Sequence, residues 1–180
     1  MVVLLVNGSP NKNGHTARAL KTVEDELHVH GVDAAWFQIG TKMVRGCIGC
    51  NKCEEACRCA FTDDKCNDMI DAIAQADAVV IGSPVYFAGP NGALCALLDR
   101  VFYAACAHKR LFRGKPAAAL TTCWRAGGVA AIDRLNKYFL YSEMPIVSSK
   151  YWNMNFMDND SFGTDVLRQL AGNMTEMLKK

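Results

Sequence analysis

Short apolar runs alternate with longer segments of helical periodicity along this chain. Val2–Val6 is a nearly continuous apolar run, which is typical of a parallel strand covered on both faces. In Ala17–His30, Leu20, Val23 and Leu27 recur on one helical face. The predicted strands are Val2–Val6, Asp33–Ile39, Ala78–Ile81, Pro116–Thr122 and Ile146–Ser149. The predicted helices are Ala17–His30, Asp68–Gln75, a segment around Leu94–Phe102, one from about Val129 to Phe139, and Thr164–Lys180.

The order of these elements predicts one α/β domain over residues 1–180. Five strands that alternate with helices are typical of a doubly wound, five-stranded parallel sheet with helices on both faces. A chain of 180 residues can bury a substantial core in one domain. We expect a cysteine-rich loop inserted at about residues 45–66, a turn-rich loop at Ser83–Asn91, and an irregular segment at Tyr151–Phe162.

The composition excludes some classes of binding partner. Apolar residues make up 51% of the chain and charged residues 21%, as in ordinary globular proteins. A net charge of +2 is too small to indicate nucleic acid or an anionic membrane as partner, and no apolar run approaches the length of a bilayer span. The first residues read as a strand rather than a signal peptide, so we expect a cytoplasmic protein. Structural disulfides then do not explain its nine cysteines.

The residues after the first predicted strand form a loop suited to a phosphate group. Gly8 and Gly14 permit tight backbone geometry. Four side chains add hydrogen-bond donors: Ser9, Asn13, His15 and Thr16. A strand, a small-residue loop and a helix together point backbone N–H groups and a helix N-terminus at an anion. The loop has neither Gly-x-Gly-x-x-Gly nor a Walker ending, so it predicts a site for one terminal phosphate. The alternative is an ordinary strand-to-helix turn.

Two later loops are expected at the same edge of the sheet, because loops after parallel strands leave from their carboxyl ends. Ser83–Asn91 carries Tyr86 and Phe87, and Thr121–Gly128 carries small residues and Arg125. An aromatic ring beside backbone amides suits a planar heterocycle. The alternative is that these rings are core aromatics at strand ends.

These motifs resemble the flavodoxin-like, NAD(P)H-dependent FMN reductase family. The resemblance covers nearly the whole chain and rests on Gly8-Ser9-Pro10, Asn13-Gly14-His15-Thr16, and Gly82–Phe87 leading to Leu98-Asp99-Arg100. The run Cys47-Ile48-Gly49-Cys50-Asn51-Lys52-Cys53 is similar to the iron–sulfur flavoprotein branch of that family.

The resemblance implies a flavodoxin-like fold with bound FMN. It implies that Ser9, Asn13, His15 and Thr16 hold the FMN phosphate. It places the flavin ring against two loops: Pro84, Val85, Tyr86, Phe87, and Arg125, Ala126, Gly127. Members of the family are commonly dimers or tetramers, so the resemblance also implies a homodimer or homotetramer with flavins near the interfaces.

Six cysteines cluster between Cys47 and Cys66. Cys-x2-Cys-x2-Cys is the spacing that a [4Fe–4S] cluster uses, and a fourth ligand must follow. Cys57 would complete a run like that of bacterial ferredoxins, whereas Cys59 gives the longer gap that resembles the iron–sulfur flavoproteins. We therefore favour four ligands: Cys47, Cys50, Cys53 and Cys59. A zinc site and a metal-free group of redox-sensitive thiols are the alternatives.

Together these features predict an FMN-dependent oxidoreductase that takes electrons from NAD(P)H or a ferredoxin-like donor. Hydride transfer to a flavin requires no general acid or base, so we predict no catalytic side chain. Two other functions remain open: a flavodoxin-like electron carrier that only docks with partners, and a redox or metal sensor built on the cysteine loop.

Overall fold

The computed structural model describes residues 1–107, 109–157 and 159–180. Its strands are β1 (Val2–Asn7), β2 (Asp33–Gln38), β3 (Ala78–Tyr86), β4 (Gly89–Pro90), β5 (Ala117–Cys123) and β6 (Met154–Phe156). Its helices are α1 (His15–Val29), α2 (Cys66–Gln75), α3 (Gly92–Cys106), α4 (Gly128–Tyr141) and α5 (Ser161–Leu178). A helix forms at each of the five predicted places.

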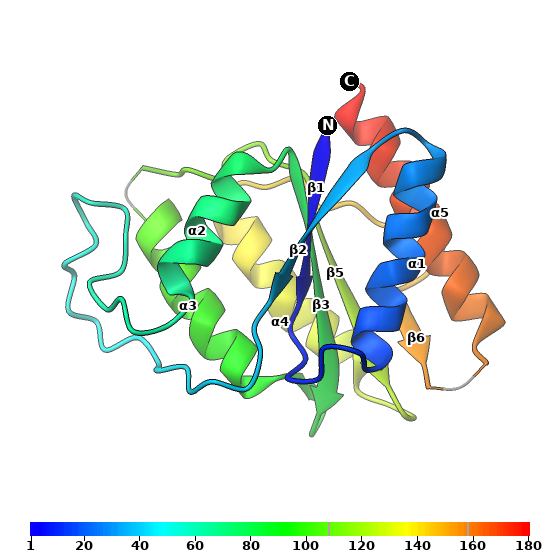
Figure 1. The fold of residues 1–180 in the computed structure, drawn as a ribbon, viewed down its shortest axis with the longest axis horizontal. Coiled ribbons are helices and arrows are strands. Elements are labelled where there is room, and N and C mark those ends of the chain that lie inside the picture. Colours follow the sequence, from blue (N-terminus) through cyan, green and yellow to red (C-terminus); the bar gives the residue numbers. More distant parts are fainter. Residues whose placement is uncertain (108, 158) are drawn as a thin grey trace.

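The main sheet is parallel, with its strands in the order β2-β1-β3-β5-β6. Val6 of β1 lies opposite Phe37 of β2 on one side and Ile81 of β3 on the other. Because β1, β3 and β5 run in the same direction, the loops that follow them leave from one edge of the sheet (Figure 1). This architecture confirms the predicted flavodoxin-like α/β fold with helices on both faces.

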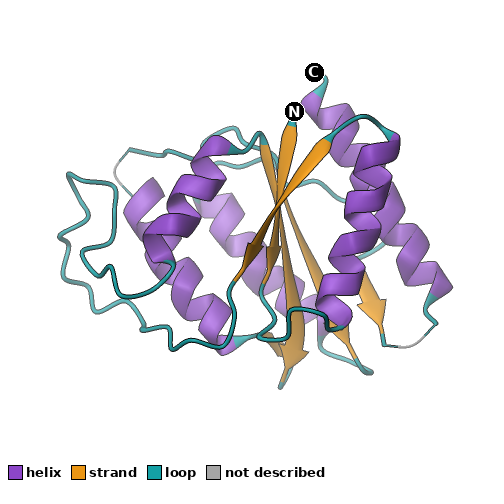
Figure 2. Cartoon of the chain, viewed as in Figure 1, coloured by secondary structure: helices purple, strands orange, loops and turns teal. Residues whose placement is uncertain are grey.

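Helices cover both faces of the sheet, which is why the central strands β1, β3 and β5 are largely apolar (Figure 2). Helices α1 and α5 pack on one face, and α2, α3 and α4 pack on the other. Alternate residues of β1 pack into the two hydrophobic cores, one on each face of the sheet. Leu4 and Val6 belong to the core under α2–α4, whereas Val3 and Leu5 belong to the core under α1 and α5.

The edge strand beside β5 differs from the prediction. The predicted strand Ile146–Ser149 contributes one isolated bridge, between Ile146 and Ala117, and the regular strand is β6, within the segment expected to be irregular. Between them, Ser149 Oγ hydrogen-bonds to Tyr151 O and to Asn153 Oδ1, both at 2.8 Å. These contacts fold the chain out of the sheet before it returns as β6.

The third strand is longer than predicted, because β3 continues to Tyr86 and forms a hairpin with β4. Phe87 and Ala88 connect the two strands with φ of 49° and 60°, the left-handed region typical of tight hairpin turns. The expected loop Ser83–Asn91 is therefore largely a rigid hairpin, which fixes the direction of each of its side chains.

The cysteine-rich loop, residues 39–65, connects β2 to α2. Figure 1 shows it extending beyond α2 and α3, away from the sheet. Lys65 Nζ donates to Gln38 O at 2.6 Å where the loop returns, and Tyr103 of α3 donates to Asn51 Oδ1 at 3.0 Å. The loop is thus attached both to the end of β2 and to the helical layer.

Candidate functional site

The three loops at the carboxyl edge meet through close backbone contacts. Gly8 N donates to Gly82 O at 2.8 Å, and a Cβ on Gly8 would lie 2.4 Å from Leu94 Cδ2, so no larger residue fits there. Gly127 has φ +85°, and a Cβ on it would lie 2.6 Å from Ala88 Cα. The third loop therefore lies directly against the β3–β4 hairpin.

A pocket of about 250 Å³ opens where these loops meet. It is lined by residues of all three loops and of the segment after β6: Ser9, Asn11, Gly14, His15, Thr16, Pro84, Val85, Tyr86, Thr122, Cys123, Trp124 and Met157. The structure thus brings together six of the residues predicted to bind the cofactor: Ser9, His15, Thr16, Pro84, Val85 and Tyr86. We call this cavity the edge pocket.

Five other predicted residues lie outside the lining of the edge pocket. Asn13 lines a neighbouring groove beside Trp36. Phe87 is fully exposed at the hairpin tip, because the left-handed turn directs its ring away from the pocket. Arg125, Ala126 and Gly127 follow the lining residue Trp124 in the third loop, and the guanidinium of Arg125 lies 4.9 Å from the Trp124 ring centroid.

Six lining residues were not predicted as individual site residues: Asn11, Gly14, Thr122, Cys123, Trp124 and Met157. Trp124 stands next to Arg125 in the predicted loop, and its ring is 75% exposed, so exposure of an aromatic side chain is the signal that identifies it. Met157 lines the pocket because it directly follows the edge strand β6, a strand that the sequence pattern did not predict.

Side chains inside the first loop hold its backbone in shape. Asn7 Oδ1 accepts from Ser9 N at 3.0 Å, Ser9 Oγ accepts from Asn11 N at 3.1 Å, and Asn11 Oδ1 accepts from Asn13 N at 3.0 Å. Each contact spans two residues and closes a small turn. Gln38 of β2 adds a bond from Nε2 to Ser9 O at 2.6 Å. The loop is thus built before any ligand arrives.

The N-terminus of α1 opens into the edge pocket. Within the described chain, no side chain caps this helix, whose N-cap residue is Gly14. The first amide bonded back along the helix is that of Arg18, which donates to Gly14 O at 3.1 Å. The amides of the preceding turn therefore have no intrahelical acceptor and carry the positive end of the helix dipole. One phosphate group fits this arrangement.

The thiols of the cysteine loop differ in exposure and in their neighbours. Cys47 and Cys50 are exposed, Cys53 and Cys57 are buried, and Cys59 is half-buried. Burial raises the pKa of the Cys53 thiol, and the nearby thiols of Cys59, Cys47 and Cys50 raise it further. The thiol form of Cys53 is therefore favoured over the thiolate in this structure. In the described ranges, no three His, Cys, Asp or Glu side chains are arranged to hold a metal ion.

The two remaining cysteines of the cluster are both buried, and Cys66 has a side-chain hydrogen bond with Cys59. Cys57 lies near Cys106 at the end of α3, where burial and then the Cys57 thiol raise the pKa of Cys106. Cys66 is fully buried at the start of α2, and burial raises its pKa to about 12. A thiol with such a pKa stays neutral at physiological pH, which suits a packing residue.

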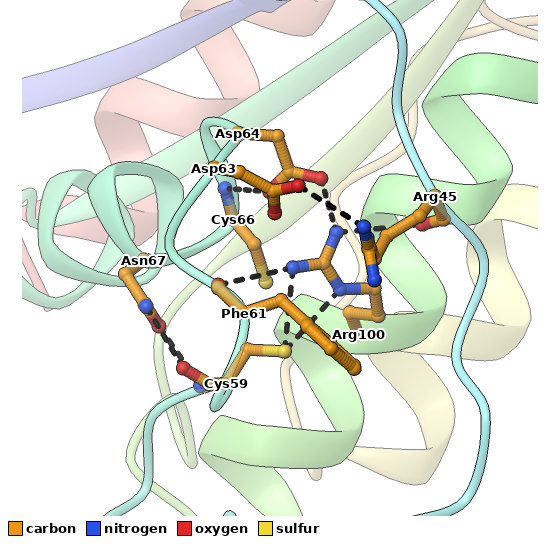
Figure 3. Close-up of polar contacts among 8 residues, drawn as sticks. All are labelled: Arg45, Cys59, Phe61, Asp63, Asp64, Cys66, Asn67 and Arg100. Carbon is orange, nitrogen blue, oxygen red and sulfur yellow. Dashed lines mark hydrogen bonds and ion pairs between the residues drawn. The ribbon is translucent and has the colours of Figure 1, made fainter.

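Cys59 is fixed through its backbone by Asn67 of α2 (Figure 3). Cys59 N donates to Asn67 Oδ1 at 2.9 Å, and Asn67 Nδ2 donates to Cys59 O at 3.0 Å. This reciprocal pair resembles one rung of a sheet and leaves the Cys59 side chain directed toward α3.

In the part of the chain that the structure describes, no helix is long and apolar enough to cross a bilayer.

Comparisons with known proteins agree with this geometry. An iron–sulfur flavoprotein of Methanocaldococcus jannaschii is 25% identical over 99% of this chain and 98% of its own length. An iron–sulfur flavoprotein of Clostridioides difficile is 31% identical over 79% of this chain and 63% of its own length. The solved structure of an NADH:FMN oxidoreductase shares the fold, with a TM-score of 0.69, 18% identity, and coverage of 99% of this chain and 88% of that one.

The family model described as NADPH-dependent FMN reductase matches residues 1–158, which include every strand and the whole edge pocket. The names of the relatives and this match together support FMN as the cofactor. The chain belongs to the NADPH-dependent FMN reductase family and is a flavin oxidoreductase.

Proposed function

We propose that this enzyme binds FMN in the edge pocket and passes electrons from NAD(P)H, through the flavin and a [4Fe–4S] cluster in the cysteine loop, to a one-electron acceptor. The observation that carries the proposal is the edge pocket itself. There the N-terminus of α1 faces the same cavity as Pro84–Tyr86 and Trp124. A phosphate site and a site for a planar ring are therefore one continuous surface.

The chain's own residues would hold FMN at two ends. Ser9, His15, Thr16 and the first-turn amides of α1 would bind the phosphate, and Asn13 would contribute by turning its side chain inward from the neighbouring groove. Pro84–Tyr86 would lie along the ring, with Phe87 and Arg125–Gly127 forming the rim that a second ligand meets. When bound, FMN supplies the ability to accept two electrons together and release them singly.

The donor set of the cysteine loop fits an iron–sulfur cluster in chemical kind. Cys47, Cys50, Cys53 and Cys59 supply four thiols, and thiolates are the ligands that such clusters use. Closing the four sulfurs onto iron requires side-chain movement, which the exposed Cys47 and Cys50 permit. Cys57 is the weaker candidate for the fourth ligand because its neighbour is Cys106.

A nicotinamide dinucleotide is the donor that the surroundings of the pocket favour. A groove of about 640 Å³ lies between α1 and α5 and shares His15 with the edge pocket. Arg18 and Arg168 line it from the two helices. Guanidinium groups bind phosphates well, so the groove suits the phosphates of NADPH while its nicotinamide reaches the flavin.

A second copy of the chain is the partner we propose for the exposed aromatic cluster near β6. Tyr151 contacts both Trp152 and Phe162 in edge-on geometry, and all three rings are about half exposed. Exposed aromatic groups of this kind tend to mark interfaces. Light scattering coupled to gel filtration would return a dimer or tetramer, and a monomer would exclude this assembly.

Anaerobic purification followed by flavin, iron and sulfide assays tests the cofactor proposal. One FMN and four irons per chain are expected, and protein that takes up no FMN would overturn the central assignment. Steady-state oxidation of NADH and NADPH then separates an enzyme from an electron carrier. Turnover with a nicotinamide supports the proposal, whereas reduction only by a ferredoxin would favour the carrier. Metal binding without FMN-dependent turnover would favour the sensor.

A further inference from the structure

Arg100 is a buried charge that the flavin site does not use. It lies on α3 and is 2% exposed. Burying a guanidinium is costly unless it is paired and fully hydrogen-bonded. Its ion-pair partner is the carboxylate of Asp64, which is also nearly inaccessible, and this pair joins the core helix to the last residues of the cysteine loop. Arg100 also belongs to the Leu98-Asp99-Arg100 motif, whose residues do not line the edge pocket.

The guanidinium of Arg100 makes five hydrogen bonds, and all of their acceptors lie in the cysteine loop (Figure 3). Nε and Nη2 each lie 3.3 Å from Cys59 Sγ. Nη2 also donates to Phe61 O at 3.3 Å, and Nη1 donates to Arg45 O at 3.4 Å and to Asp64. A guanidinium carries five N–H donors in one rigid plane, so a single side chain can satisfy this whole set.

These acceptors stand on both sides of the predicted ligands along the chain. Arg45 precedes Cys47, whereas Phe61 and Asp64 follow Cys59. Arg100 therefore brings the two ends of the cysteine segment to one point on α3. Loop closure restricts the conformations of the intervening residues, which lowers the entropy lost when they bind a ligand.

Neighbouring groups reinforce this closure. The Arg45 guanidinium lies 4.3 Å from the Phe61 ring centroid and donates to Asp63 at 3.1 Å. Asn67 holds the backbone of Cys59 on the other side. Cys59 is therefore restrained through both its backbone and its sulfur, whereas Cys47 and Cys50 are exposed.

We propose that Arg100 is the positioning residue of the cysteine loop: it closes the loop on α3 and selects Cys59 as the fourth ligand by donating two N–H groups to its sulfur. The inference rests on the cluster in the proposed function. It gives the buried guanidinium a role toward that cluster, because a nearby positive charge offsets the negative charge of four thiolates. Hydrogen bonds to ligand sulfurs also favour the reduced form of such clusters and so raise their reduction potential.

The test compares wild-type protein with Arg100→Lys and Arg100→Met after anaerobic reconstitution with ferrous iron and sulfide. Three quantities are measured: iron per chain, the rate at which a ferrous chelator removes that iron, and the reduction potential of the cluster. We expect the Met variant to lose iron about 10- to 100-fold faster, the range typical when a group that orients a metal ligand is removed. Its cluster potential shifts to more negative values. The Lys variant keeps the positive charge and some N–H donors. Its rate of iron loss and its cluster potential should therefore lie between those of the wild type and the Met variant.

Arg134→Met is the matched control, because Arg134 pairs with Asp99, the neighbour of Arg100 on α3. It should keep wild-type iron retention and potential. FMN occupancy reports whether each variant folds. If the Met variant fails to fold, the Lys variant decides: faster iron loss with a lower potential supports the inference, and wild-type values overturn it.

The outcomes also separate this inference from the function on which it rests. Wild-type protein that takes up no iron overturns the cluster and Arg100's role together. Wild-type protein with four irons, alongside a folded Met variant that keeps both its iron and its potential, overturns the role of Arg100 alone.

Discussion

The hydroxyl of Thr16 lies 2.8 Å from the hydroxyl of Thr122, and both side chains are buried. This contact joins the first turn of α1 to the end of β5. Both residues line the edge pocket. The pair therefore sets the spacing between the loop proposed to bind phosphate and the strand end from which the third loop begins.

Replacing Thr16 with Val should weaken FMN binding about tenfold, which corresponds to about 1.4 kcal/mol. Val keeps the volume of the side chain but removes a donor from the pocket and leaves the Thr122 hydroxyl without this partner. Unfolding free energy should fall by about 1–3 kcal/mol for the same reason. Quenching of flavin fluorescence gives the affinity, and denaturant titration gives the stability.

Thr22→Val serves as the control, because the Thr22 hydroxyl donates to Arg18 O within its own helix and does not line the edge pocket. Its FMN affinity should equal that of the wild type. Equal affinities for Thr16→Val and the wild type would mean that the Thr16 hydroxyl does not contribute to the cofactor site.

Replacing Gly127 with Ala should displace the third loop from the hairpin. The new Cβ would lie 2.6 Å from Ala88 Cα, and the left-handed φ of +85° disfavours any side chain there. We expect a loss of about 1–3 kcal/mol in unfolding free energy and weaker FMN binding. Thermal unfolding with and without FMN measures both effects.

Gly92→Ala provides the comparison, since among the described residues no atom lies within 4 Å of a Cβ at that position. This residue starts α3, where Ala is a better helix former than Gly. Its stability should match or exceed that of the wild type. A similar loss of unfolding free energy in both variants would show that the contact between Gly127 and Ala88 is not the cause of the destabilisation.

The parts of the site that depend on local sequence were predictable. The strand–loop–helix arrangement proposed to bind phosphate follows from the order Val2–Val6, Gly8, Gly14 and a helical pattern, and Ser9 and Thr16 line one pocket. Short-range turns formed by Asn7, Ser9 and Asn11 shape this loop, and Gln38 of β2 adds a bond to it from a distant part of the chain.

Features that depend on distant contacts were not predictable. The β-branched residues of Ile146–Ser149 have strand character, yet β6 pairs with β5 because the side chain of Asn153 bonds to Ala119 O and Asn153 O accepts from Thr121 N. Phe87 has the character of a ring-stacking residue, but the two-residue hairpin turn sends it outward. Likewise, no spacing rule connects Arg100 to Cys59, since only the fold brings α3 beside that loop.

Removing the two guanidinium groups of the groove should raise the KM for NADPH. Arg18→Gln with Arg168→Gln removes two positive charges that face the proposed phosphate positions. We expect KM for NADPH to rise about tenfold or more, since each charged hydrogen bond contributes about 1.5–3 kcal/mol, with little change in kcat. Arg113→Gln, which removes a surface partner of Glu143, should leave KM unchanged. An unchanged KM in the double variant would place the dinucleotide elsewhere.

Tyr138 should make stability fall at alkaline pH. Burial, and then its hydrogen bond to Asp99, raise the pKa of its hydroxyl well above the ordinary value of 10.0. In the unfolded chain the hydroxyl ionises near pH 10, whereas in the folded chain it stays protonated. Its stabilising contribution is therefore complete below pH 10 and is lost as the pH rises above that value, by up to about 1.4 kcal/mol per pH unit.

Urea unfolding of wild-type protein and Tyr138→Phe between pH 9 and pH 11 measures this effect. The variant should show a shallower decline of unfolding free energy above about pH 10. Tyr141→Phe, which removes an exposed hydroxyl on the same helix, should follow the wild-type curve. Parallel curves for Tyr138→Phe and the wild type would contradict the assignment.

Serine substitutions at Cys57 and Cys59 should distinguish the fourth ligand of the proposed cluster. The sulfur of Cys59 receives two N–H groups from Arg100, whereas Cys57 is buried. Cys59→Ser should therefore lose most of its iron on reconstitution and the broad visible absorption of the cluster, while FMN stays bound. Cys57→Ser should keep wild-type iron and lose only the packing of a buried thiol, a modest decrease in stability. The reverse result would assign the ligand to Cys57, and full iron content in both single variants but not in the double variant would indicate that the two thiols exchange.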